Sequence, residues 1–335
     1  MLIKPCQLIL SAAILLAAHT HSADAEDNPP FHLQPHHVAP LVALNEAVAL
    51  MGPADPPYVF PEEEELFKKI AAGQANKCDE SDAILVASGV ADKATREIYI
   101  AKINAITEIS RKVVEGATTP ENKASRLAFV LFNTQLKGGF DDDQVDIRKL
   151  LDEHRFNCVS SCVLFNLVGN RLGLQTRAVN LPGHVFLRMG DLVIEPVNGK
   201  TMTTSAHQET VDFYWGKAGD NWKQTFGNTR FYESGNLGLV SEIYLDDSIA
   251  QVRKKQFESA AAKILKACCL DSKNPIVAHQ LEKNLRVWFA DTLKQKNYDN
   301  AQVIAAIYGQ LFGDDSNKLF IQVTAARKVG QAAKN

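Results

Sequence analysis

Residues 158–172, with the sequence CVSSCVLFNLVGNRL, constrain the fold more than any other stretch because they are apolar almost all round a helical wheel. A helix without a polar face is stable only when protein covers it on every side. Asn157 suits the N-cap position, and Gly173 suits the left-handed position after the last turn. We therefore predict a buried central helix that begins at Cys158, with the remaining elements packed around it.

Three strands are predicted directly after this helix. The residues QTRAVNL (175–181) form the first, and GHVFLRM (183–189) and LVIEPV (192–197) form a hairpin around Gly190 and Asp191. A two-residue turn of this kind fixes the pairing of the strands that flank it. The segments before the central helix show helical periodicity, so the expected fold class is α+β.

The hairpin register places two polar side chains on one face of the sheet. With a two-residue turn, Glu195 lies opposite Phe186 on the neighbouring strand. His184 is two residues from Phe186 and shares its face, which makes Glu195 the diagonal neighbour of His184 at about 7–8 Å by backbone position. We therefore expect the carboxylate of Glu195 to reach the imidazole.

Cys158 is the candidate nucleophile of the chain. As the first helical residue it faces unpaired backbone N–H groups and the positive end of the helix dipole, and both stabilise a thiolate. We expect the pKa of this thiol to lie below its usual value of about 8.5, in the range of roughly 3.5–7.5. Cys162 lies one turn deeper and is expected to pack in the core. His184 would act as the base, and Glu195 would orient its ring.

Two other interpretations of these residues remain open from the pattern alone. A lone cysteine is most often a small buried apolar residue, and a lone histidine or glutamate in a strand is most often structural. Alternatively, Cys158, Cys162, His184 and Glu195 could share a zinc ion, because thiolates at positions i and i+4 can ligate one metal. The chain contains no paired CxxC motifs, which weakens the metal interpretation.

The first 25 residues have the features of a secretory signal peptide. A basic residue near the start precedes an apolar run from Leu8 to Ala18, which is too short to span a bilayer, and small residues near Ala25 suit cleavage. We expect a secreted or periplasmic protein in an oxidising compartment, with no membrane span after signal removal. The five cysteines that remain are too few for a disulfide scaffold, and the sequence leaves the pairing of Cys78, Cys162, Cys268 and Cys269 open.

The rest of the chain divides into four further segments. Residues 26–60 are rich in Pro and His and suit a flexible lead-in, whereas 61–200 include the helical part and the strands of the core. Residues 201–236 are polar and aromatic with little periodicity, which favours a cover or linker. From 237 to 335 the pattern is helical. The net charge of −3 provides no basic field that would indicate nucleic acid as a partner.

The C-terminal helical segment contains a weak internal sequence repeat. Phe257 and Tyr298 are each followed three residues later by an alanine, Ala260 and Ala301. An aromatic residue and an alanine at this spacing often open the second helix of a tetratricopeptide repeat, although the spacing between the two copies exceeds the usual period of about 34 residues. We predict degenerate helical repeats, with two generic helical hairpins as the alternative.

The stretch NCVSSCVLFNLVGNRLGLQTRAVNLPGHVFLRM, followed by LVIEP, resembles the transglutaminase-like (papain-like) superfamily, and in particular its bacterial SirB-type core domain. In that core a buried helix led by Cys precedes RLGL, a strand, PGH and a strand with a carboxylate. The resemblance implies an α+β core whose helix packs on a small antiparallel sheet, followed by tetratricopeptide-like helices. Carried over by position, the superfamily's Cys-His-Asp triad becomes Cys158, His184 and Glu195, with Glu where Asp is commoner.

Residues and resemblance together predict an exported thiol enzyme that acts on amide bonds by acyl transfer or hydrolysis. Asn157 could support an oxyanion, although N-capping explains this residue equally well. No metal or organic cofactor is implied. The helical repeats would bind a peptide or protein, as partner or as substrate. The alternative is a catalytically inactive periplasmic scaffold that binds a peptide through these repeats.

Overall fold

The computed structural model describes residues 60–72, 74, 77–218, 231–271, 273–312 and 316–332. The predicted signal peptide and the predicted lead-in up to residue 59 lie outside these described residues.

The helices that precede the sheet begin where side-chain caps occur in the sequence. Asp79, Asp92 and Thr119 each accept a hydrogen bond from a backbone N–H of the following turn. The helical character predicted for the segments before the central helix is confirmed. In the described part of the chain these helices are α3 (Pro61–Ala71), α4 (Glu80–Ala87), α5 (Lys93–Val114), α6 (Pro120–Thr134), α7 (Ile147–Glu153) and α8 (Cys158–Arg171).

A five-stranded antiparallel sheet follows, with the strand order β4-β3-β2-β1-β5. Its hairpin has the predicted register, because Leu187 pairs with Ile194 and Arg188 pairs with Val193. The α+β fold class is therefore confirmed. The strands are β1 (Arg177–Leu181), β2 (His184–Met189), β3 (Leu192–Glu195), β4 (Lys200–Thr203) and β5 (Tyr232–Ser234), with the short 3₁₀ helix η2 (Pro196–Asn198) between β3 and β4.

Residues 201–236 contribute more regular structure than their polar pattern indicated. They supply most of β4, all of β5 and the helix α9 (Gln208–Ala218), which covers one face of the sheet. Both strands are short edge strands, so neither is long enough to show a clear alternation of buried and exposed residues. This is why sequence periodicity did not reveal them.

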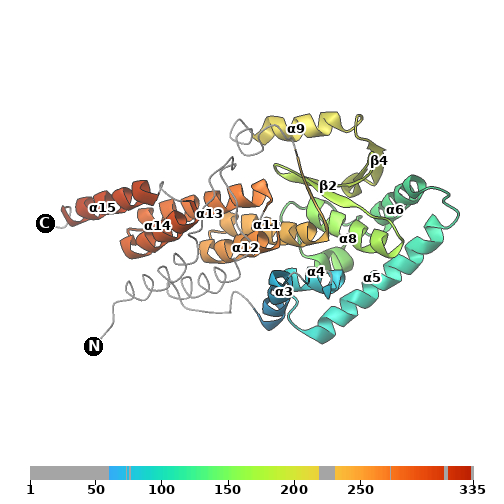
Figure 1. Cartoon of the computed structure of the whole chain (residues 1–335), viewed down its shortest axis with the longest axis horizontal. Coiled ribbons are helices and arrows are strands. Elements are labelled where there is room, and N and C mark those ends of the chain that lie inside the picture. The colour runs from blue at the N-terminus through green and yellow to red at the C-terminus, as the bar shows by residue number, and fades with distance from the viewer. Residues whose placement is uncertain are drawn as a thin grey trace.

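The sheet lies between two helical layers, as Figure 1 shows. Val185 and Leu187 join the main hydrophobic core, which contains the apolar side chains of α8. Phe186 points to the opposite face, where it joins a smaller cluster that is covered by Val211 and Tyr214 of α9. Alternate residues of β2 therefore face different layers, as the pleat of a strand requires.

Helix α8 is the buried central helix that the sequence predicts. Every residue from Val159 to Gly169 is buried. The helix begins at Cys158 with Asn157 as its N-cap, and Gly173 follows its end in the left-handed conformation with φ of 80°. Packing on all sides fixes this helix, so its first turn is a rigid platform.

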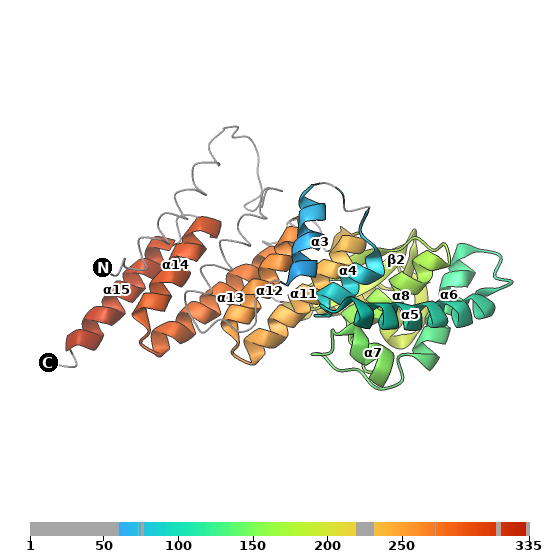
Figure 2. The same cartoon turned by 90° about the horizontal axis from the view of Figure 1, so that it is seen from below.

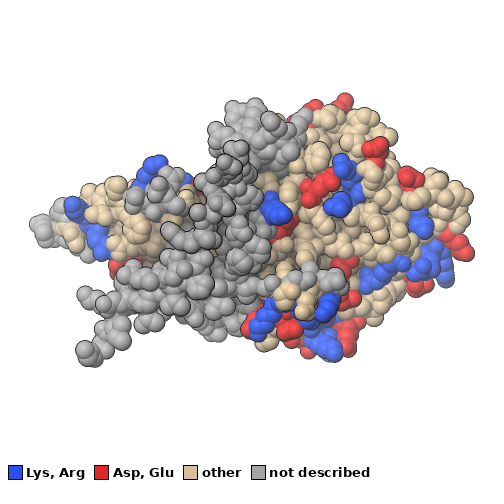
Figure 3. All heavy atoms as spheres, in the orientation of Figure 1, with Lys and Arg blue, Asp and Glu red and all other residues tan. Residues whose placement is uncertain are grey.

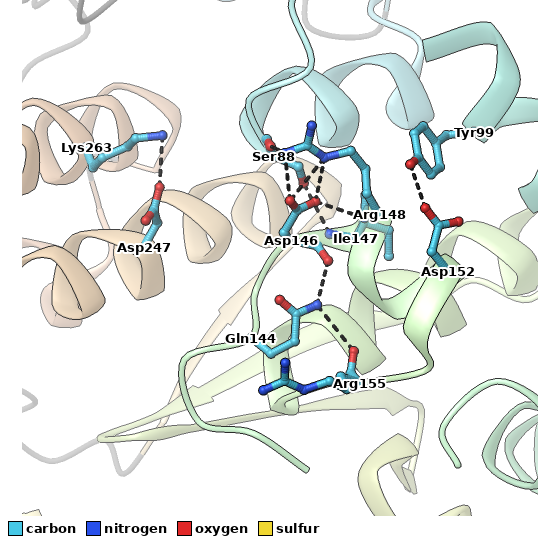
Figure 4. A network of polar contacts seen from close by, with 10 residues as sticks. All are labelled: Ser88, Tyr99, Gln144, Asp146, Ile147, Arg148, Asp152, Arg155, Asp247 and Lys263. Carbon is cyan, nitrogen blue, oxygen red and sulfur yellow. Dashed lines mark hydrogen bonds and ion pairs between the residues drawn. The ribbon is translucent and has the colours of Figure 1, made fainter. Parts of the chain in front are cut away.

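A polar network holds the loop that leads into α8 (Figure 4). The side chain of Gln144 donates hydrogen bonds to the carbonyl oxygens of Asp146 and Arg155. The carbonyl of Gln144 accepts a hydrogen bond from the Oγ of Ser160, at 3.1 Å. Arg148 pairs with Asp146 and also bonds the carbonyl of Ser88. The approach to Cys158 is therefore fixed by hydrogen bonds as well as by apolar packing.

The C-terminal part is all-helical, as predicted. Figure 2 shows its helices side by side in chain order, extending away from the sheet. Phe257 and Tyr298 begin α12 and α14, and the alanines three residues later, Ala260 and Ala301, are fully buried. These helices are α11 (Asn236–Arg253), α12 (Phe257–Leu270), α13 (Pro275–Lys294), α14 (Tyr298–Phe312) and α15 (Ser316–Ala332).

The described surface is mixed in charge, and basic and acidic side chains are interspersed on the face in Figure 3. None of the helices in the described ranges combines the length and the apolar character that a membrane span requires.

A buried ion pair joins the first described helix to the C-terminal helices. The Nζ of Lys266 on α12 lies 2.6 Å from Oε2 of Glu63 on α3, and both side chains are almost completely buried. The hydroxyl of Tyr244 on α11 donates to the other carboxylate oxygen at 2.7 Å. Burial lowers the pKa of Lys266 to about 8, although the Glu63 carboxylate acts in the opposite direction. The pair therefore depends on both partners being present.

We predict that Glu63→Ala lowers the free energy of unfolding by about 3–5 kcal/mol, because it leaves the Lys266 ammonium buried without a carboxylate. Denaturant unfolding measures this loss. Glu64→Ala is the matched control: its ion pair with Lys68 is on the surface, so its loss is expected to stay below about 1 kcal/mol. Similar losses in the two variants would contradict this role of Glu63.

Candidate active site

Cys158 stands at the first position of α8, as the sequence predicts. The Oδ1 of Asn157 accepts a hydrogen bond from the backbone N–H of Ser160 at 2.9 Å, and the Oγ of Ser160 bonds back to the N–H of Asn157. This capping box uses one of the unpaired N–H groups of the first turn. The backbone N–H of Val159 contacts the sulfur of Cys158, whereas the N–H of Cys158 makes no hydrogen bond to any other described residue and remains available beside this half-buried residue.

Asn157 is fully engaged in holding this turn. Its Nδ2 donates to the Oδ2 of Asp246 on α11 at 2.6 Å and to the carbonyl of Asp142 at 3.4 Å. Only 1% of the residue is exposed. Because its amide donors already have partners, the geometry favours the capping role over the expected oxyanion role.

His184 and Glu195 form the hydrogen-bonded pair that the hairpin register predicts. The Nε2 of His184 lies 3.1 Å from Oε1 and 3.2 Å from Oε2 of Glu195. Both residues are buried, with 8% and 3% of their surface exposed. This contact fixes the proton of the neutral ring on Nε2, since a carboxylate only accepts. The other ring nitrogen, Nδ1, makes no hydrogen bond within the described part of the chain, so it is left with a free lone pair.

A second histidine binds the same carboxylate. The Nε2 of His207 lies 2.6 Å from Oε1 of Glu195, and His207 is 1% exposed. The sequence reasoning did not identify this residue, because it lies in the segment 201–236 that shows no periodicity. The one signal in the sequence was a histidine a few residues before the aromatic run Phe213, Tyr214 and Trp215.

The paired side chains lie on the α9 side of the sheet. The ring of His184 stacks on Tyr214 of α9, with centroids 4.3 Å apart and planes at 4°. The core of α8 packs against the opposite face of the sheet. Alternation along β2 shows which residues share a face but does not show which helix covers that face.

The sulfur of Cys158 lies beside the first residues of β2. The backbone of Val185, the residue next to His184, provides a hydrogen-bonding contact to this sulfur. Between the two described side chains of Cys158 and His184 themselves there is no hydrogen bond. Cys162 is fully buried one turn deeper, with its Sγ 3.5 Å from the carbonyl oxygen of Val185, which confirms its predicted packing role.

No group of three or more His, Cys, Asp or Glu side chains in the described ranges is placed to hold a metal ion. The set Cys158, Cys162, His184 and Glu195, considered above for zinc, does not form such a group. None of the cysteines in the described ranges is bonded in a disulfide to another described cysteine.

Residues 97–228 match the family model that is described as the transglutaminase-like superfamily. This stretch is similar to a transglutaminase-like core domain. The match covers less than half of the chain and includes Cys158, His184, Glu195 and His207. A search of curated proteins and a search of solved structures found no match.

The Cys158 thiol has a pKa above its usual value, which differs from the expected lowering. Burial of the Cys158 sulfur is the largest cause, and the carboxylate of Asp246 adds to it. Burial also raises the pKa of Asp246 to about 7, and the pKa of Glu242 lies well above its usual value for the same reason. The sequence indicated the helix start, which lowers the pKa of a thiol. It did not indicate these acidic neighbours, because they belong to α11, far along the chain.

Glu195 differs from these acidic neighbours. Burial alone would raise its pKa, but hydrogen bonds from His184 and His207 outweigh burial and hold the pKa below its usual value. Glu195 is therefore ionised at neutral pH, as a residue that orients an imidazole must be.

We predict that Asn157→Ala lowers the free energy of unfolding by about 1–2 kcal/mol, because the first turn of α8 loses its cap. Thermal or denaturant unfolding provides the measurement. Asn157→Ser keeps an oxygen at the cap and should recover part of the loss. A variant with alanine as stable as the wild type would show that the cap does not hold this turn.

We also predict that Glu195→Gln is less stable than the wild type at neutral pH by about 1–3 kcal/mol, since the histidines lose a charged acceptor. Folding lowers the pKa of Glu195, so its stabilisation is complete above the unfolded value of about 4.3 and is lost as pH falls through the lower folded value. Unfolding curves below about pH 5 should therefore show the two proteins converging. A constant difference down to about pH 2 would be inconsistent with an ionised Glu195.

Proposed function

We propose that the transglutaminase-like domain catalyses acyl transfer or hydrolysis at an amide, with Cys158 as nucleophile, His184 as base and Glu195 as the group that orients the base. The observation that carries this proposal is the buried contact between Nε2 of His184 and the carboxylate of Glu195. It leaves Nδ1 as the ring nitrogen that can accept a proton. The family match, whose range includes all three residues, supports a thiol-dependent reaction.

The reaction would proceed through a thioester. The sulfur of Cys158 forms a bond to the amide carbon while the thiol proton moves to Nδ1 of His184. The carbon–nitrogen bond then breaks, and His184 returns the proton to the leaving amine. Water or a second amine attacks the thioester and gives its proton to His184. The carbon–sulfur bond then breaks, and His184 passes the proton to the departing sulfur. The N–H group of Cys158 would stabilise the oxyanion at the start of α8.

The raised pKa of the thiol favours proton transfer during attack over a preformed thiolate. A small movement at the start of α8 or at β2 is needed, because Cys158 and His184 share no hydrogen bond. Catalytic contacts are often long in the absence of substrate and tighten when it binds.

We further propose that the protein is exported and that its C-terminal helices are degenerate tetratricopeptide-like repeats that bind a peptide or protein. The support is the apolar N-terminal run and the equivalent positions of Phe257 and Tyr298 at the starts of α12 and α14. The likeness to SirB-type proteins rests on the sequence motif.

A second candidate is a catalytically silent scaffold. Its support is the raised pKa of the Cys158 thiol and the absence of a hydrogen bond to the described ring of His184. In this case the repeats alone carry the function, and the core domain only supports them.

Alkylation by iodoacetamide, followed by mass spectrometry of the cysteine peptides, separates the two candidates. We predict that Cys158 in the wild type reacts at least about tenfold faster near pH 7.5 than in His184→Gln, because the imidazole assists deprotonation. Half-buried Cys78 serves as the reference thiol within every sample. Cys158→Ala should fold and show no alkylation at position 158. Cys162→Ala is the matched control, in which Cys158 should still be alkylated. Equal rates at Cys158 in the wild type and His184→Gln would favour the scaffold.

A further inference from the structure

Glu195 is shared by two histidines, and the second has no part in the reaction described above. The contact from His207 to Oε1 is shorter, at 2.6 Å, than the contacts from His184 at 3.1 and 3.2 Å. The two rings approach from different elements: His184 begins β2, and His207 lies in the turn before α9. A carboxylate held from two sides cannot rotate away from either ring without losing a hydrogen bond.

Burial makes the second contact necessary. Glu195 is 3% exposed, and an ionised carboxylate at this depth needs several donors to replace its lost water. His184 supplies one N–H, and His207 supplies the other. The remaining ionisable groups near Glu195 are the phenol of Tyr214, the thiol of Cys162 and, directly across from it on β4, exposed Lys200.

The position of His207 is itself fixed. Its ring packs on Phe186 with centroids 4.4 Å apart. Its backbone N–H donates to the carbonyl of Thr203, and its carbonyl accepts from the N–H groups of Thr210 and Val211. The turn before α9 therefore delivers the imidazole to Glu195 in one orientation.

We propose that His207 is a positioning residue for the thiol site: its Nε2–H holds the Glu195 carboxylate ionised and aimed at His184. The inference rests on the proposed function, because it concerns the same base. The side-chain contacts described for His207 are with Glu195 and Phe186, so it acts on the thiol site through Glu195. Its effect is to keep the proton of His184 on Nε2 and the lone pair of Nδ1 free for the thiol.

The matched variants are His207→Met and His207→Gln. Methionine and glutamine have similar length and shape, but only glutamine provides an N–H donor near the position of Nε2. The measured quantity is the alkylation rate of the Cys158 peptide between about pH 6 and 9, a range that brackets the usual thiol pKa. His184→Gln gives the rate without the base and is the lower reference. We expect His207→Met to react about tenfold more slowly than the wild type near pH 7.5, and His207→Gln to stay within about threefold.

The outcomes separate the two proposals. Wild type and His184→Gln reacting alike would remove the proposed function itself. If His184→Gln is slow but His207→Met reacts like the wild type, the positioning role is overturned. If His207→Gln is as slow as His207→Met, His207 only fills space beside Phe186, and the positioning role is again overturned.

A measurement on the wild type covers the case in which His207→Met does not fold. Long-range proton–nitrogen NMR correlations report which ring nitrogen of each histidine carries the proton. We expect the Nε2–H form for His207 at neutral pH, with an exchange-protected proton. An Nδ1–H form of His207 would contradict the proposal, because Nε2 would then have no proton to donate to Glu195.

Discussion

The complete burial of α8 is the constraint on which the rest of the structure depends. Because the helix has no solvated face, helices α5, α6 and α11 and the sheet must each cover a part of it. The same packing fixes the first turn, where Asn157 caps the helix and binds Asp246 of α11. The position of Cys158 is therefore set by the core rather than by a loop, which suits a residue whose sulfur must stand in one place.

Local patterns predicted the parts of the candidate site that depend on local geometry. The two-residue turn at Gly190 and Asp191 fixed the pairing of β2 with β3, so the contact between His184 and Glu195 followed from strand register. Asn157 and Gly173 marked the ends of α8 because capping depends on a few adjacent residues. These signals operate within one element or one hairpin.

The features that the sequence did not reveal depend on contacts between distant elements. His207 comes from a turn without periodicity and is recognised only when Glu195 is in view. The raised pKa of Cys158 comes first from burial of its sulfur and then from Asp246 of α11, and both causes are results of tertiary packing. Strand alternation placed His184 and Glu195 on one face, but it could not show that α9 rather than α8 covers that face.

The buried contact between Glu63 and Lys266 bears on how the protein can be divided. A fragment that begins after α3 would retain the ammonium of Lys266 within the apolar interface without its counterion. The hydroxyl of Tyr244 would lose its acceptor in the same fragment. Any shortened form of the chain that keeps α12 must therefore also keep α3, although α11 would still pack on α4 and α8 if α3 were cut away.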